Sequence, residues 1–211
     1  MSGANDRQPT LAAADLHAQI RETAFALLLI DQRSVDPSAI GRLVGLTGSA
    51  IAPLLDELNA AGWMDRDPAG RVTGSGGLSL TDGPHRLTID GSTFHNWCAY
   101  DSLGIAAALE ADATIRTACP ICGTAIDVGT VAGRALAGRP ERLWLAEGGI
   151  DLRNDFCTPT VLLCSAAHAD AWSVQQGGRG RTVDLTEAAE LGAVGWAGCA
   201  EAVARVRGLA S

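Results

Sequence analysis

The spacing of apolar residues changes near residue 80, and this change limits the chain to folds that combine helices with strands. Before it, apolar residues recur at helical intervals in three stretches, 16–32, 36–45 and 47–63. Asp36 followed by Pro37 is a helix-start signal, Thr47 is another, and Gly62 is a stop signal. Residues 64–80 read as a hairpin with "DPAG" at its turn. Three helices followed by a hairpin are typical of a winged-helix domain.

Strand patterns dominate after residue 80. Apolar or alternating runs predict strands within residues 85–90, 114–131, 142–146 and 158–166. Helical patterns cover residues 93–111, 167–176 and 185–210, with a break in the last near Gly192–Gly198. This mixture predicts an α+β fold. We expect three parts: a loose tail over residues 1–15, a winged-helix-like domain over 16–80 and a strand-rich α+β domain over 81–211.

The charge pattern argues against nucleic-acid binding. The chain has a formal net charge of −8 and 16 arginines but no lysine. The helix expected at 47–61 would be the DNA-reading helix of a winged-helix domain, yet it has no basic residue and contains Asp56 and Glu57. Phosphate neutralisation supplies most of the affinity for DNA, so this helix would repel it. We expect the N-terminal domain to be a packing module that does not bind DNA.

Targeting signals are not evident in the sequence. No apolar run reaches the ~18 residues of a membrane-spanning helix, so we expect no membrane span. Residues 1–15 lack the basic, apolar and small-residue order of a signal peptide. We therefore expect a cytoplasmic protein whose six cysteines are reduced and available for metal binding or catalysis.

The segment "CPICG" places Cys119 and Cys122 at the spacing of half a zinc site. A tetrahedral site needs two more ligands, but no second C-x-x-C pair exists and the four histidines are scattered. Cys98 or His95 would have to join from a distance. A thioredoxin-like redox pair is a weak fit, because a strand rather than a helix is expected after it. The alternative is that Cys119 is a small buried residue in a tight turn.

Two cysteines belong to the apolar run near residue 160. Cys157 precedes the expected strand and Cys164 falls inside it, an odd number of residues away. Their side chains should therefore point to opposite faces, and we do not expect them to bind the same atom. Cys164 and Cys199 are expected to be core residues.

Cys98 and Asp101 are three residues apart in "TFHNWCAYDSLGI". This spacing brings their side chains together only on a helix. At the first turn, the helix dipole should lower the pKa of the Cys98 thiol. Apolar neighbours should raise the pKa of the Asp101 carboxyl group by burial. The alternative is that Asp101 caps the helix and Cys98 packs inward.

Four segments resemble the organomercurial (alkylmercury) lyase family, in the same order and with similar spacing over roughly residues 15–200. "FHNWCAYDSL" (94–103) is similar to the active-site helix of that family, and "GGLSL" (76–80) to the segment leading into its catalytic part. "CPICGTAIDV" (119–128) resembles a turn with a structural cysteine. "DFCTPTVLLCSAAHADAW" (155–172) resembles the segment with the second catalytic cysteine.

The resemblance implies an enzyme that cleaves carbon–mercury bonds by protonolysis, giving a hydrocarbon and Hg(II). Cys98 and Cys157 would bind the mercury, and Asp101, beside the metal, would move a proton from a thiol to the leaving carbon. Thiolates suit this task because soft ligands select soft metals. The α+β domain over 81–211 would be the catalytic domain. No cofactor is implied, since mercury is substrate and product.

The resemblance also implies partners and departures. Organomercurials would be the substrates, low-molecular-weight thiols would support turnover, and a mercuric reductase would receive the Hg(II). Cys119 would be structural. Cys122 and Cys164 are additions to the family pattern, and Thr158 stands where members often have a further cysteine.

Two other functions stay open at this point. One is a winged-helix heavy-metal sensor or trap that binds a thiophilic ion through cysteines without lyase activity; the acidic charge argues against it. The other is a structural protein stabilised by zinc at "CPICG", which lacks an evident second ligand pair.

Overall fold

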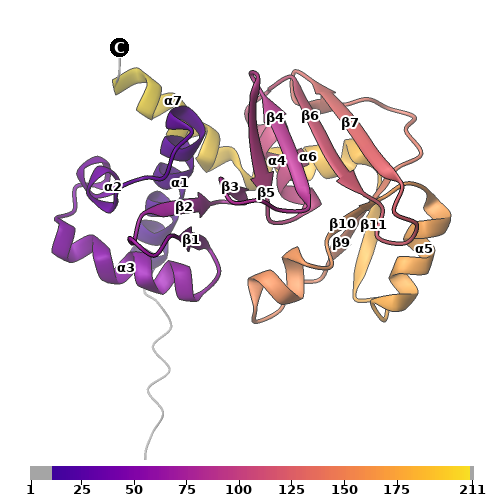
Figure 1. Ribbon diagram of the computed structural model, residues 1–211, viewed down its shortest axis with the longest axis horizontal. Coiled ribbons are helices and arrows are strands. Elements are labelled where there is room, and N and C mark those ends of the chain that lie inside the picture. Colours follow the sequence, from indigo (N-terminus) through magenta and orange to yellow (C-terminus); the bar gives the residue numbers. More distant parts are fainter. Residues whose placement is uncertain (1–10, 210–211) are drawn as a thin grey trace, which may run out of the picture.

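The computed structural model describes residues 11–209, and its N-terminal part consists of three helices (Figure 1). They are α1 (Leu11–Asp31), α2 (Pro37–Val44) and α3 (Gly48–Ala60). Asp36 caps α2 as predicted, because its carboxylate accepts a hydrogen bond of 2.8 Å from the Ser38 N–H. Helix α1 begins at Leu11, so residues 11–15 of the expected tail are helical. Residues 1–10 lie outside the described part of the chain.

An eight-stranded antiparallel sheet runs through the middle of the molecule, with the order β1-β2-β3-β5-β4-β6-β7-β8. Its strands are β1 (Met64–Arg66), β2 (Val72–Ser75), β3 (Leu78–Ser79), β4 (His85–Ile89), β5 (Ser92–Asn96), β6 (Ala113–Ala118), β7 (Ala125–Val131) and β8 (Arg134–Ala135). The hairpin expected at 64–80 is present as β1 and β2. Leu78 pairs with Asn96, so the sheet continues without interruption across residue 80.

A second, three-stranded antiparallel sheet has the order β10-β9-β11. Its strands are β9 (Arg142–Ala146), β10 (Val161–Leu163) and β11 (Gly180–Val183), and helix α5 (Ala166–Gln175) packs against all three. This sheet and α5 lie together at the end of the molecule remote from α1–α3 (Figure 1). The two sheets and the helices confirm the predicted α+β class.

The remaining α-helices are α4 (Ala99–Ala108), α6 (Leu185–Gly195) and α7 (Ala197–Leu209). Helix α4 packs against α6, and α7 returns to pack against α1 (Figure 1). The α4–α6 contact is very close, because a Cβ added to Gly192 would lie 2.3 Å from the Cα of Gly104. Buried apolar side chains from all parts of the described chain form one core.

Two segments differ from the sequence prediction. The stretch 93–111 is not one helix, since its first residues belong to β5, where Phe94 and Asn96 are buried and His95 between them is more exposed. The stretch before β10 contains a π-helical turn, η1 (Leu152–Cys157), which no periodicity indicated. Strand β10 ends at Leu163, so Cys164 lies outside the strand in which it was predicted.

Within residues 11–209, no single helix has both the length and the apolar character needed to cross a membrane, and α2 with α3 reaches them only as a pair bent by 108°.

Candidate active site

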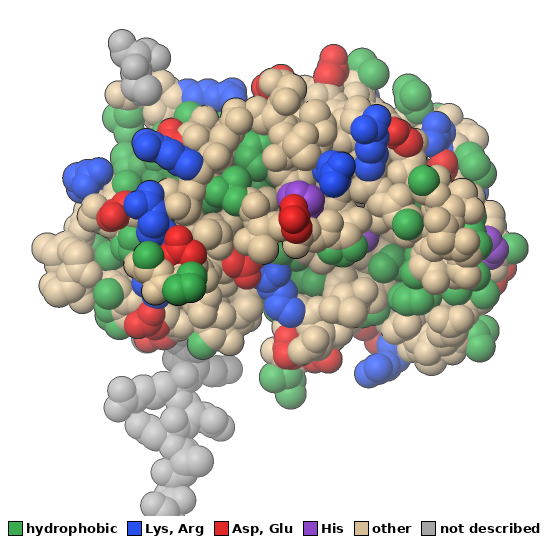
Figure 2. Space-filling model, in the orientation of Figure 1, with side chains coloured by type: hydrophobic (Ala, Val, Ile, Leu, Met, Phe, Trp, Pro, Cys, Tyr) green, Lys and Arg blue, Asp and Glu red, His purple; other side chains and the backbone are tan. Residues whose placement is uncertain are grey.

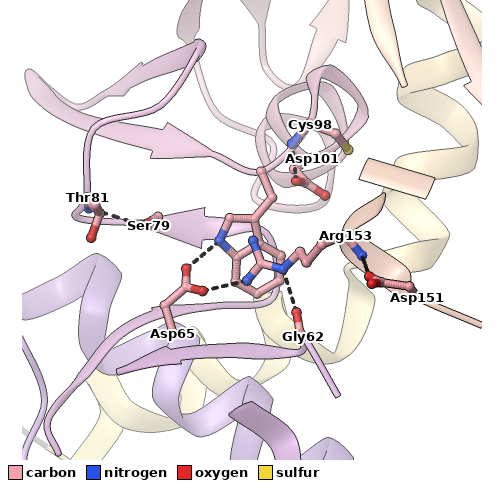
Figure 3. A network of polar contacts seen from close by, with 9 residues as sticks. Gly62, Asp65, Ser79, Thr81, Cys98, Asp101, Asp151 and Arg153 are labelled. Carbon is pink, nitrogen blue, oxygen red and sulfur yellow. Dashed lines mark hydrogen bonds and ion pairs between the residues drawn. The ribbon is translucent and has the colours of Figure 1, made fainter. Parts of the chain in front are cut away.

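Cys98 lies at the junction between β5 and α4, as the N-cap residue of the helix. Its backbone N–H donates a hydrogen bond of 2.8 Å to Oδ2 of Asp101, one turn along (Figure 3). Cys98 is 0% exposed and Asp101 4% exposed. The expected pairing of these two side chains is therefore present, and the alternative role of Asp101 as a helix cap is present with it.

A glycine turn between β2 and β3 packs against Asp101. Gly77 has a φ of 86°, and a Cβ at this position would lie 2.5 Å from Cγ of Asp101. Both the left-handed backbone and the close approach require glycine here. Asn96 fixes the turn, since its Nδ2 donates a hydrogen bond of 2.9 Å to the Gly77 carbonyl. The segment "GGLSL" thus forms one wall around the carboxyl group.

Cys157 reaches the same place from the last residue of η1. It is 5% exposed, and its thiol lies close enough to the Cys98 thiol to contribute to the raised pKa of that group. The backbone connects the two segments as well, because the Ala99 N–H donates to the Thr160 carbonyl at 3.2 Å. The structure therefore brings together Cys98, Asp101 and Cys157.

A polar network holds η1 against the eight-stranded sheet (Figure 3). The Arg153 guanidinium donates hydrogen bonds to Oδ1 of Asp65 at 2.7 Å and to the Gly62 carbonyl at 2.6 Å. Its Cζ lies 3.3 Å from the centroid of the Trp97 ring, and the Trp97 indole N–H donates to the other oxygen of Asp65 at 2.7 Å. Trp97, next to Cys98, and Arg153, on the segment that carries Cys157, are thus both tied to one carboxylate on β1. Sequence reasoning missed Asp65 and Arg153, which are 88 positions apart.

A cavity of about 250 Å³ lies beside these groups. Asp101 and Cys157 line it, whereas Cys98 lies behind its surface. Five aromatic residues form much of the remaining wall, namely Trp63, Trp97, Tyr100, Phe156 and Trp196. Cys199 and the charged residues Arg21 and Glu22 also line it. The Tyr100 ring makes edge contacts with Phe156 and Trp196, at centroid distances of 6.3 and 5.2 Å. The cavity suits a small apolar group beside a thiol.

Burial dominates the electrostatics of the site. It raises the pKa of Asp101 to about 6, against the opposing effect of the hydrogen bond from the Cys98 N–H. The direction agrees with the sequence prediction. Burial also raises the pKa of the Cys98 thiol well above its usual value, with further contributions from Cys157 and the Asp101 charge. The prediction that the helix dipole would lower this pKa is wrong, because removal from water outweighs the dipole.

A second cysteine cluster lies outside this cavity. The ligand atoms of Cys119, Cys122, Cys164 and His168 all lie within 4.8 Å of one another. The prediction that "CPICG" lacks a second ligand pair is wrong, because Cys164 and His168 supply one. Cys164, expected in the core, is only partly buried and packs against the core from outside it. Cys164 follows β10 directly, and His168 is on the first turn of α5, so the two meet at helical spacing. Cys199 is buried, as expected.

Comparisons with known proteins agree on one family. The model of the alkylmercury lyase family (MerB) matches residues 78–197, more than half of the chain. An alkylmercury lyase from Pseudomonas putida is 27% identical over 164 residues, covering 74% of this chain and 76% of that protein. One from Staphylococcus epidermidis is 25% identical over 175 residues, covering 81% and 80%.

The fold is also similar to a solved structure, described as the mercury-bound form of MerB2. The TM-score is 0.73, with 18% identity, over 92% of this chain and 100% of the other. The family match includes the β5–α4 junction and η1, and therefore both segments that form the cavity. On these grounds, this chain belongs to the alkylmercury lyase family.

Proposed function

We propose that this chain cleaves the carbon–mercury bond of organomercurials by protonolysis, with Cys98, Cys157 and Asp101 as the reacting groups. The observation that carries the proposal is that two buried thiols and a buried carboxyl group meet at one apolar cavity. Thiolates are soft ligands and favour soft metals such as mercury. A carboxyl group with a pKa of about 6 can both accept and donate a proton near neutral pH. Membership of the family supports the same reaction.

Substrate capture begins at Cys157 in this proposal, since that thiol lines the cavity and Cys98 lies behind its surface. The Cys157 sulfur displaces the ligand X from R–Hg–X and binds the R–Hg group, and its proton leaves with X. The Cys98 thiol has a raised pKa and needs a base. The ionised Asp101 carboxylate takes its proton, and the resulting thiolate becomes the second sulfur ligand of mercury.

Bond cleavage returns that proton to the substrate. The second thiolate adds electron density to the metal, which makes the bound carbon more basic. Asp101 donates its proton to this carbon, and the electron pair of the Hg–C bond becomes the new C–H bond. The hydrocarbon R–H leaves, and mercury stays as Hg(II) on two sulfurs. The electrons balance without an oxidant or reductant, so the proposal includes no cofactor.

The N-terminal region is assigned a packing role. Its three helices and the β1–β2 hairpin support the winged-helix-like description of residues 16–80, with 81–211 as the catalytic domain. Helix α3 has no basic residue, and Asp56 and Glu57 lie on it. Arginines and acidic side chains alternate on the face in Figure 2 without a continuous basic stripe there. We infer that this region covers the core rather than binding DNA.

Hg(II) held by two thiolates leaves most readily by thiol exchange. We therefore propose that low-molecular-weight thiols sustain turnover and that a mercuric reductase takes the ion afterwards. Such an exchange fits a reducing compartment, and the cytoplasm remains our prediction for its location.

The test is methane release from methylmercury, measured by gas chromatography in the presence of excess thiol. Wild type is compared with Cys157→Ser and with Cys199→Ser, because the Cys199 thiol lines the same cavity. We expect methane from wild type and a complete loss in Cys157→Ser. A complete loss in Cys199→Ser, with release maintained in Cys157→Ser, would make Cys199 the second thiol instead.

The same assay separates the enzyme from a binding protein. If wild type binds mercury tightly and stoichiometrically but releases no methane, the lyase proposal fails. A heavy-metal sensor or trap would then be the function to pursue.

A further inference from the structure

The turn between β6 and β7 presents two cysteines in a fixed geometry. The Cys119 N–H donates to the Thr124 carbonyl at 2.9 Å, and the Gly123 N–H donates to the Cys119 carbonyl at 2.8 Å. These bonds close the "CPICG" loop. Cys119 is buried at its base, and Cys122 is exposed at its tip. Two sulfurs are therefore held on one side of a tight turn.

A second ligand pair faces this turn from the junction of β10 and α5. Ser165 is the N-cap of α5, and its hydroxyl accepts a hydrogen bond from the His168 N–H at 3.3 Å. This cap sets the first helical turn, so Cys164 and His168 project together. Nδ1 of His168 lies 3.1 Å from Sγ of Cys164 and 3.5 Å from Sγ of Cys119. Three sulfurs and one ring nitrogen thus converge from two elements.

The spacing of the donor atoms matches a four-coordinate ion. Sγ of Cys122 lies 3.7 Å from Sγ of Cys164, and all four donors lie within 4.8 Å of one another. A tetrahedral zinc ion with Zn–S bonds of ~2.3 Å and a Zn–N bond of ~2.0 Å separates its sulfurs by ~3.8 Å and sulfur from nitrogen by ~3.5 Å. The Cys122–Cys164 distance and the distance from Cys119 to His168 match these edges, and the distance from Cys164 to His168 is shorter by about 0.4 Å.

We propose that Cys119, Cys122, Cys164 and His168 bind one zinc(II) ion in a structural site, independent of the lyase reaction. Sulfur and nitrogen donors in tetrahedral arrangement favour zinc among the divalent metals. Four protein ligands leave no position for substrate, which is the pattern of a structural rather than a catalytic zinc. No other group of three or more such ligands gathers this closely within residues 11–209.

The position of the site indicates what the ion does. Cys119 and Cys122 belong to the turn of the eight-stranded sheet, while Cys164 follows β10 of the three-stranded sheet. Cys98 follows β5 of the first sheet after Trp97, and Cys157 precedes β10 of the second. The zinc ion holds together the two sheets that flank the segments with the two mercury-binding thiols of the proposed reaction. It acts on their relative position without contacting substrate.

The experiment is zinc analysis by mass spectrometry of three purified proteins. Wild type is compared with Cys122→Ser/Cys164→Ser and with Cys98→Ser/Cys157→Ser. The first pair lies at the less buried edge of the cluster, and circular dichroism verifies that the variant is folded. We expect stoichiometric zinc in wild type and in Cys98→Ser/Cys157→Ser, and loss of zinc in Cys122→Ser/Cys164→Ser. Loss of zinc in Cys98→Ser/Cys157→Ser, with zinc retained in Cys122→Ser/Cys164→Ser, would overturn the proposal.

Cobalt(II) provides the second readout. Zinc is removed with a chelator under reducing conditions, and cobalt(II) is added to the apoprotein. A tetrahedral site with three thiolates gives intense visible absorption together with a thiolate-to-metal charge-transfer band. We expect both in wild type and in Cys98→Ser/Cys157→Ser, and neither in Cys122→Ser/Cys164→Ser. A Cys122–Cys164 disulfide in metal-free wild type, with no cobalt spectrum after reduction, would also overturn the proposal.

Discussion

At the scale of single residues, the central feature is a carboxyl group that the fold has removed from water. Asp101 is nearly fully buried, and its ionised form keeps only part of its stabilisation, through the hydrogen bond from the Cys98 N–H. This balance places its pKa at about 6, well above the value of about 4 for an Asp side chain in water. A group of this kind can change protonation state twice in one reaction cycle.

Asp101→Asn should abolish the proton transfer while preserving the shape of the site. The amide oxygen can still accept the Cys98 N–H, but the side chain cannot carry a proton to carbon. We expect the turnover number to fall by about 100-fold or more, in the range of general acid–base catalysis. Hydrocarbon release from methylmercury measures this effect. Unchanged release would remove Asp101 from the mechanism.

The same substitution should alter stability in a pH-dependent way. The pKa of Asp101 is higher in the folded chain than in the unfolded chain, so the folded state loses stability as the pH rises from about 4 to about 6. The loss of unfolding free energy that comes from ionising the buried carboxyl group is complete near pH 8. It amounts to about 3 kcal/mol, at ~1.4 kcal/mol for each pKa unit. Asn has no charge and avoids it.

Urea denaturation of wild type and Asp101→Asn tests this linkage. The variant should gain unfolding free energy at about pH 8 and far less at about pH 4. An equal difference in unfolding free energy at about pH 4 and about pH 8 would show that burial does not raise the pKa of Asp101.

Residue-scale properties were predictable where they depend on nearby sequence. Apolar neighbours indicated that burial would raise the pKa of Asp101, and the structure agrees. The direction for Cys98 was wrong, since complete burial depends on η1 and β10, which arrive from about 60 residues away. Cys164 was misplaced because its strand ends at Leu163, three residues before the end of the expected stretch 158–166.

At the scale of elements, a turn and a helical segment shape the site. The turn with Gly77 approaches Asp101 so closely that no side chain fits between them. The η1 segment carries Cys157 and is fixed by Arg153. Helix α2 was predictable from Asp36 and Pro37, which act locally. The π-helical turn was not, because distant groups such as Asp65 hold it in place.

Gly77→Ala should disturb both the backbone and the carboxyl group. Gly91→Ala is the matched control, since Gly91 has a similar φ of 78° but no atom within 4 Å of an added Cβ. Both variants should lose ~1–2 kcal/mol from the left-handed backbone. Only Gly77→Ala should also displace Asp101 and lower turnover, by about 100-fold for a shift near 1 Å. Equal activities in the two variants would contradict this role for the turn.

Arg153→Lys should loosen η1 while keeping the positive charge. Lysine cannot reproduce the planar contacts of the guanidinium with Asp65, Gly62 and the Trp97 ring. We expect turnover to fall by about 10- to 100-fold through misplacement of Cys157. Arg116→Lys, which changes an exposed ion pair with Asp127, is the control and should leave the rate unaltered. Loss of stability with full turnover in Arg153→Lys would argue against a positioning role.

At the scale of the whole molecule, continuity across residue 80 is the main feature. The proposed boundary between residues 16–80 and 81–211 follows the change in sequence pattern, yet β3 pairs with β5 across it and α7 packs against α1. The sequence pattern indicated which elements form. The order of strands in the sheet and the packing of α7 against α1 depend on contacts between segments that are distant in the sequence. Local signals carry little information about such contacts.

One core, and an eight-stranded sheet that continues across residue 80, predict a single cooperative unfolding transition. Tryptophan fluorescence and far-ultraviolet circular dichroism should give coincident urea curves, because neither part can lose its structure without exposing the surface of the other. An early transition confined to the N-terminal helices would instead show that residues 16–80 fold as a separate unit.

The aromatic wall of the cavity has a consequence for observing the reaction. Three of the five tryptophans, Trp63, Trp97 and Trp196, line the space where the metal would reside. A heavy atom in contact with an indole ring quenches its fluorescence by promoting intersystem crossing to the triplet state. Mercury is among the heaviest atoms that proteins bind. The proposed site therefore has its own optical signal. Tryptophan fluorescence should fall when mercury binds and recover when thiols remove it, so each catalytic cycle can be followed in real time without a label.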